Sequence, residues 1–103
     1  MGLSGLTAAF DLARKGYAVS VYEARDRFGG RLLDFPEAVL PRRILCDELA
    51  IVESVFAEIS LNAGLQPENL AALRRECDAL YLAVGWPSSS TFGLSETEGG
   101  LVA

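Results

Sequence analysis

The apolar residues near the amino end of the chain follow the spacing of an α-helix. They lie three or four positions apart, at Leu6, Ala9, Phe10 and Ala13. Because this spacing puts them on one face of a helix, and because glycine commonly ends helices, the pattern predicts a helix over Leu6 to Arg14 that ends before Gly16. The next segment, Tyr17 to Tyr22, is a β-branched and aromatic run. It predicts a strand that leads directly to an acidic residue, Glu23.

In the middle of the chain, a segment without regular apolar spacing is followed by one with helical spacing. Residues 24 to 36 mix charged residues with a Gly-Gly pair and follow neither period, so we expect a loop. Pro41 is suited to the first position of a helix. An apolar stripe with helical spacing follows it, made of Leu45, Leu49, Val52 and Phe56. This stripe predicts a second helix that covers a hydrophobic core.

Shorter elements are expected toward the carboxyl end. Apolar and polar residues alternate around Ile59 to Leu61 and predict a short strand, and Pro67 to Arg75 predicts a third helix. Ala79 to Val84 is apolar without alternation, as expected of a parallel strand buried on both faces, and ends at Gly85. Residues 86 to 103 are loop-like, with a short terminal strand expected at Leu101 to Ala103.

The order of these elements predicts an α/β fold with right-handed crossovers and a parallel sheet. We expect a partial Rossmann-like three-layer domain over residues 1–85 and a loop-like tail over residues 86–103. A dinucleotide-binding fold begins with a strand that feeds a glycine-rich turn, whereas here the turn starts at residue 2. We therefore expect the sheet to lack its first strand. The gap could be closed by direct pairing of 18–22 with 79–84, by the tail, or by a strand from a second copy in a homodimer.

Composition narrows the classes of protein. A chain of 103 residues and 11.0 kDa has room for one compact domain, and a hydrophobic content of 50% predicts a folded core. The net charge of −5 argues against nucleic acid and anionic membranes as partners. Neither a membrane-spanning run nor a signal peptide is recognisable, so a cytoplasmic protein is expected. With no histidine and no zinc-ligand spacing, we expect no metal site, and Cys46 and Cys77 should be buried, reduced thiols.

Candidate chemistry lies at the predicted start of the first helix and at the end of the first strand. The opening segment reads Gly2-Leu3-Ser4-Gly5, and Glu23 follows 18 residues after Gly5. This spacing fits the last two glycines and the acid of a GxGxxG fingerprint. The glycines would allow close backbone approach to a pyrophosphate at the helix start, and Glu23 would accept hydrogen bonds from both ribose hydroxyls. The alternative interpretation is two glycines in a frayed terminus and a solvated glutamate.

A longer motif favours the first interpretation. The sequence GLSGLTAAFDLARKGYAVSVYEARDRFGGRL resembles the N-terminal FAD-binding segment of two-dinucleotide-binding-domain flavoproteins. The segments FPEAVLPRRILCDELAIVESV and CDALYLAVG make it most similar to the glutamate synthase small subunit and the related part of dihydropyrimidine dehydrogenase, among the pyridine nucleotide-disulfide oxidoreductases. The amine oxidase and phytoene desaturase group is the second candidate, because EARDRxGGR is almost verbatim there. Both groups bind FAD.

The resemblance implies a set of cofactor-binding residues and no catalytic residue. The expected set is Gly2, Leu3, Ser4 and Gly5 at the pyrophosphate, Glu23, Ala24 and Arg25 at the adenosine ribose, Gly29, Gly30 and Arg31 near the flavin-bearing half, and Gly85 after the last strand. Glycines at the doublet would allow close backbone approach, and a cationic Arg31 could offset phosphate charge. Val84 stands where the family has Thr, which weakens the expected contact at Gly85. The doublet could otherwise be a simple turn, and the arginines a solvated face.

The function expected from this resemblance is that of an FAD-binding fragment of a flavin- and pyridine-nucleotide-dependent oxidoreductase. In the family, electrons pass from a reduced nicotinamide to the flavin and onward, whereas nothing here matches the nicotinamide-binding domain. The chain is thus expected to bind FAD without being a complete enzyme. The alternatives are a non-catalytic interaction or remnant module, which includes a strand-swapped homodimer, the FAD-binding part of an amine oxidase-like enzyme, and a simple NAD-binding domain. The last is disfavoured because the Arg-Phe-Gly-Gly-Arg motif has no role there.

Overall fold

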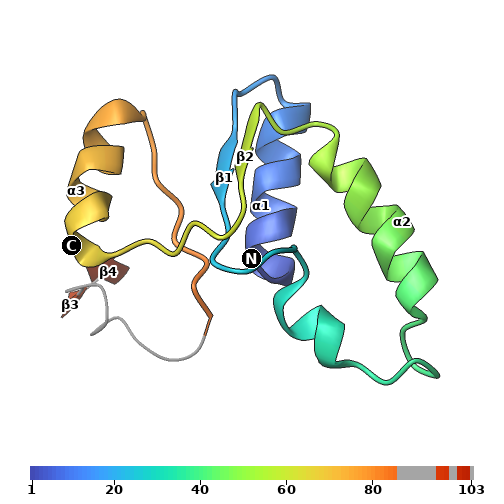
Figure 1. The fold of residues 1–103 in the computed structure, drawn as a ribbon. Helices are drawn as coiled ribbons and strands as arrows, with labels where there is room; N and C mark the ends of the chain where they lie inside the picture. Colours follow the sequence, from blue (N-terminus) through green and yellow to red (C-terminus); the bar gives the residue numbers. More distant parts are fainter. Residues whose placement is uncertain (86–94, 98–99, 103) are drawn as a thin grey trace. The chain divides into compact units, whose positions relative to one another are not determined.

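The computed structural model describes residues 1–85, 95–97 and 100–102. The chain divides into two compact units, Met1–Gly64 and Leu65–Ala103. The first unit contains helix α1 (Leu3–Arg14), strand β1 (Ser20–Tyr22), a 3-10 helix η1 (Gly30–Asp34), helix α2 (Arg42–Glu53) and strand β2 (Glu58–Ser60). The second contains helix α3 (Pro67–Glu76) and strands β3 (Ser95–Thr97) and β4 (Gly100–Val102) (Figure 1).

The first unit is a parallel strand pair packed against helices. β1 and β2 run parallel, with Val21 opposite Ile59. The core cluster consists of Leu6, Ala9, Val21 and Phe28. Side chains from α2 and the turn after it pack against this cluster, among them Leu49, Val52 and Phe56. Both long helices of this unit therefore contribute to one core, and the predicted apolar stripes are confirmed.

The ends of α1 follow from its sequence. Gly2 precedes the helix with extended backbone, and Leu6 N–H donates to the Gly2 carbonyl at 3.0 Å. The helix is thus one turn longer at its start than the apolar spacing predicts. At the other end Gly16 adopts φ +95°, a conformation that glycine accepts without steric cost, and turns the chain toward β1.

The second unit contains the third predicted helix and a small hairpin. α3 begins with Pro67, and the Gln66 N–H donates to the Asn69 side chain at 3.1 Å, which stabilises the helix start. β3 and β4 pair antiparallel, with Glu96 opposite Leu101. The predicted terminal strand is confirmed as β4, while most of the predicted loop-like tail lies outside the described residues.

Three expectations are corrected. The strand predicted over 79–84 is irregular, because an apolar parallel strand needs partners for its backbone groups and no strand in the described part of the chain pairs with it. Among the described residues β1 pairs with β2 and β4 with β3, so neither direct pairing of this segment with β1 nor insertion of the tail is found there. Finally, Cys46 and Cys77 are free thiols, as predicted, but exposed rather than buried, because Cys46 lies off the apolar stripe of α2 and Cys77 follows the end of α3.

The predicted α/β class and the parallel pairing are confirmed, as part of a Rossmann-like arrangement. The predicted loop between β1 and α2 also contains η1 (Gly30–Asp34), a local turn of helix that glycine-rich sequence did not indicate. None of the described helices combines the length and apolarity that crossing a membrane requires.

Candidate functional site

The predicted glycine-rich turn lies at the start of α1. Because the first N–H groups of a helix have no intrahelical acceptor, the backbone from Leu3 onward points donors out of this end of the helix. Gly5 is buried, whereas the side chains of Leu3 and Ser4 are exposed. An added Cβ at Gly2 would meet nothing within 4 Å. The turn is therefore open to close approach at Gly2.

The glycine doublet packs directly against this turn. A Cβ on Gly30 would lie 2.8 Å from Gly2 Cα and 3.1 Å from Gly2 N, and Gly30 has φ +50°. The Gly29 N–H donates to the Met1 carbonyl at 3.0 Å, with φ +120° at Gly29. Both positions need glycine for conformation, and Gly30 needs it for space as well. The doublet therefore fixes the path of the opening turn.

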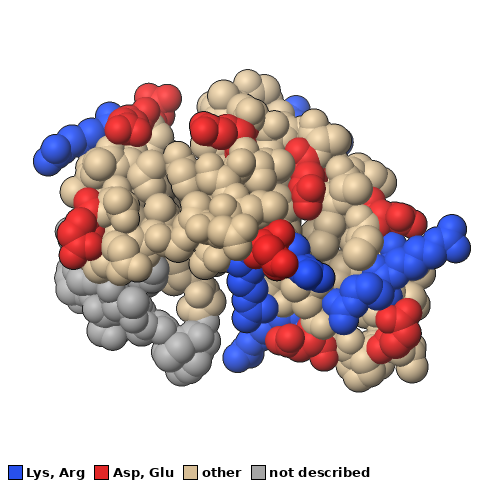
Figure 2. Space-filling view, in the orientation of Figure 1, with Lys and Arg blue, Asp and Glu red and all other residues tan. Residues whose placement is uncertain are grey.

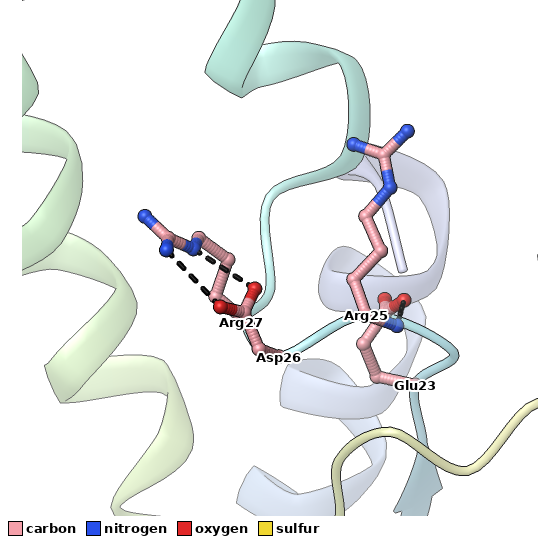
Figure 3. A network of polar contacts seen from close by, with 4 residues as sticks. All are labelled: Glu23, Arg25, Asp26 and Arg27. Carbon is pink, nitrogen blue, oxygen red and sulfur yellow. Dashed lines mark hydrogen bonds and ion pairs between the residues drawn. The ribbon is translucent and has the colours of Figure 1, made fainter.

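Glu23 lies where β1 ends and is held by backbone bonds on both sides. Its N–H donates to Ser60 O at 2.9 Å, and its carbonyl accepts from Ala63 N at 2.8 Å. Its side chain is only 5% exposed. Oε1 accepts a hydrogen bond from the Arg25 backbone N–H at 2.8 Å, a turn visible in Figure 3. The carboxylate is thus fixed and buried rather than solvated.

The second carboxylate oxygen of Glu23 is paired with the amino end of the chain. Oε2 is buried and forms an ion pair with the Met1 amino group. Burial lowers the pKa of that amino group, and the nearby Arg25 lowers it further. A ligand hydroxyl that bound Oε2 would have to share or displace this amino group.

The structure brings some of the predicted cofactor-binding residues together, and others lie away from them. Gly2, Glu23 and the doublet surround Met1, as described above. The Arg25 side chain extends away from the Glu23 carboxylate (Figure 3). Ala24 and Arg31 are exposed. Gly85 belongs to the second unit, with φ +79°, and its role stays a prediction.

A cationic pocket near these residues was not predicted. Its volume is about 350 Å³, and it is lined by Arg25, Asp26, Arg27, Leu33 and Arg42. Arg42 is the first residue of α2, and the N-terminal end of a helix is unfavourable for a cation. The Glu37 carboxylate lies beside it, accepts from the Arg42 backbone N–H at 3.1 and 3.2 Å and caps α2.

Comparison with known proteins supports the resemblance. A family model described as flavin containing amine oxidoreductase matches residues 3–47. The beta subunit of the NADP(+)-dependent formate dehydrogenase of Moorella thermoacetica is 37% identical over 101 residues, covering 95% of this chain and 14% of that protein. The NAD-dependent dihydropyrimidine dehydrogenase subunit PreT of Escherichia coli (strain K12) is 33% identical over 97 residues, covering 92% of this chain and 24% of that protein.

The glutamate synthase [NADPH] small chain of Mycobacterium tuberculosis is 37% identical over 87 residues, covering 82% of this chain and 18% of that protein. Both predicted groups are thus found, and the resemblance to glutamate synthase small chain and dihydropyrimidine dehydrogenase subunits is confirmed. The chain spans 14 to 24% of the length of these curated relatives. No solved structure matches it significantly.

Proposed function

We propose that this chain is the FAD-binding part of an NAD(P)H-dependent oxidoreductase related to the glutamate synthase small chain. The observation that carries the proposal is the buried Glu23 carboxylate at the end of β1, which the Arg25 N–H and the Met1 amino group hold beside the opening turn of α1. An adenosine ribose offers hydroxyl donors of the kind that a carboxylate accepts. The similarity to subunits of NAD- and NADP-dependent oxidoreductases and to a flavin-containing family supports the same assignment.

The residues would divide the cofactor between them. Glu23 would accept the ribose hydroxyls, with Ala24 and Arg25 alongside. The backbone from Gly2 through Leu3 and Ser4 to Gly5 would face the diphosphate, because the positive end of the α1 dipole favours anions. Gly29, Gly30 and Arg31 would lie toward the flavin-bearing half, and Gly85 is proposed as a further contact from the second unit.

The chain's own part in the reaction would be binding and orientation. FAD, when bound, would supply the electron transfer from a reduced nicotinamide, since protein side chains carry no such chemistry. We assign no catalytic residue. Because the chosen relatives are named as subunits or a small chain, we also propose that the chain acts within a larger oxidoreductase.

Titration with FAD tests the proposal. Glu23→Gln keeps the shape of the side chain but removes the charge that strengthens its hydrogen bonds. We expect about tenfold weaker FAD binding, since a hydrogen bond to a charged group contributes about 1.5–3 kcal/mol. Flavin fluorescence measures the affinity, and riboflavin, which lacks the adenosine, should bind both proteins equally.

The matched control is Glu48→Gln, an exposed glutamate on α2. It should bind FAD as the unaltered chain does. If Glu23→Gln and Glu48→Gln bind FAD with equal affinity, the ribose assignment is wrong.

A second candidate is an interaction module that pairs with a partner or with itself. In the described residues β1 pairs with β2 alone, so its other edge has no strand beside it. A free edge readily accepts a further strand. Colour separates the candidates: purified chain that is yellow from bound flavin supports the first, whereas colourless chain that does not respond to added FAD supports the second.

A further inference from the structure

The loop after β1 and the start of α2 form one cationic surface. The pocket between them is lined by Arg25, Asp26, Arg27, Leu33 and Arg42, all in the first unit. In Figure 2, Lys and Arg side chains lie on the side of this unit where η1 and the start of α2 lie, with Asp and Glu side chains among them. The lining includes three arginines and one aspartate, an excess of two positive charges on a chain with a net charge of −5, and the Glu37 carboxylate lies beside it on the Arg42 N–H. Such a local concentration of positive charge is suited to an anion.

The donors of these arginines are only partly used within the described residues. Arg27 donates from Nε to Asp26 Oδ1 at 3.1 Å and from Nη2 to Asp26 Oδ2 at 3.2 Å. Arg42 donates from Nη2 to the Leu33 carbonyl at 2.7 Å, and this bond holds its guanidinium at the pocket wall. A guanidinium has five donors, so both groups keep others for a ligand. The Arg25 guanidinium makes no hydrogen bond or ion pair with a described side chain, and it extends clear of Glu23 (Figure 3).

The size of the pocket limits what it can hold. At about 350 Å³ it lies near the lower end of ligand pockets, which span about 300–1,000 Å³. That space suits one compact anionic group rather than a whole dinucleotide. Guanidinium groups match the geometry of phosphate oxygens and bind them in pairs of parallel hydrogen bonds.

We propose that this pocket is a binding site for a phosphoryl group, held by Arg25, Arg27 and Arg42. The group could belong to the diphosphate of the flavin nucleotide, which would then lie in this pocket instead of at the start of α1, or to a separate phosphate compound. The first source rests on the proposed function, whereas the second does not. In either case Arg42 recognises the anion from α2, well beyond the glycine-rich motif in the sequence.

Inorganic pyrophosphate is the probe. Isothermal titration of the whole chain should show binding that weakens about tenfold in Arg42→Gln and in Arg27→Gln. Arg43→Gln is the matched control, because its neighbour Arg43 is exposed, lies outside the pocket lining and is placed 4.0 Å from Asp47. It should bind as the unaltered chain does. Asp26→Asn removes the one negative charge of the lining and should tighten binding by about threefold. Circular dichroism checks that each variant is folded.

The outcomes decide between the sources and test the site itself. If pyrophosphate displaces FAD, the flavin nucleotide supplies the phosphoryl group; if it binds FAD-loaded chain without displacement, a separate compound does. If the unaltered chain does not bind pyrophosphate, or if Arg42→Gln and Arg27→Gln bind it as Arg43→Gln does, the proposal is wrong. Loss of the Glu23 effect on FAD with the Arg42 effect on pyrophosphate intact would reject the ribose assignment alone.

Discussion

A few backbone hydrogen bonds and one ion pair fix the position of Glu23. Its backbone joins β1 to the turn after β2 through Ser60 and Ala63, while its carboxylate lies buried against the amino end of the chain. The position of this acid could be predicted from the sequence, because it follows a strand at a known spacing from Gly5. Its burial could not, because the residues that cover it are far away along the chain. The structure therefore adds to the spacing argument that this carboxylate is buried and ion-paired with the Met1 amino group.

Gly30 offers a test of the contact between the doublet and the opening turn. Gly30→Ala would bring a Cβ to 2.8 Å from Gly2 Cα at a φ of +50°, so the backbone must shift. Holding a non-glycine residue in such a conformation costs about 1–3 kcal/mol, and the clash adds to that cost. We expect Gly30→Ala to lower the free energy of unfolding, measured in urea, by about 2–4 kcal/mol.

Gly16→Ala separates the two contributions. Gly16 also has a positive φ, +95°, but an added Cβ there would meet nothing within 4 Å. It should lose only the conformational part, about 1 kcal/mol. Equal losses in the two variants would mean that Gly30 does not pack against Gly2 as described.

At the scale of elements, local patterns were sufficient for the helices and not for one strand. α1, α2 and α3 were predicted because an apolar face or a proline start is encoded within a dozen residues. The segment 79–84 has an apolar sequence typical of a buried strand, yet a strand forms only where another strand supplies hydrogen bonds. Arg42 was missed as a site residue for a related reason, since only folding brings it to Arg25 and Arg27.

Phe28 links the loop after β1 to the turn that follows α2. It is 1% exposed and meets Phe56 edge-on, with ring centroids 6.2 Å apart. Phe28→Ala would leave a cavity in the core and should cost about 3–5 kcal/mol. That is a large part of the roughly 5–15 kcal/mol that stabilises a small domain, so the urea midpoint should fall steeply. Phe35→Ala, at a position 47% exposed, is the control and should fall by less than about 1 kcal/mol. Similar midpoints for both variants would contradict the assignment of Phe28 to the core.

At the scale of the whole molecule, the chain divides into two units, and its relatives extend well beyond it. The first unit holds nearly all of the predicted cofactor residues, whereas Gly85 and the irregular segment 79–84 belong to the second. Several side chains of that segment are exposed despite being apolar, with Tyr81 at 59% and Val84 at 54%. An apolar segment that is partly exposed, and that no described strand pairs with, has the composition of a strand that could join a further sheet.

Hydrogen exchange tests this interpretation. In dilute solution the amides of Leu82 and Val84, for which the described residues offer no backbone hydrogen bond, should exchange at nearly the rate of an unfolded chain. The Glu23 amide, bonded to Ser60 O at 2.9 Å, should exchange much more slowly. If a second copy completes the sheet, protection of Leu82 and Val84 should grow with protein concentration, because association depends on concentration. Protection that is strong at every concentration would mean that the segment is paired within one chain, contrary to the structure.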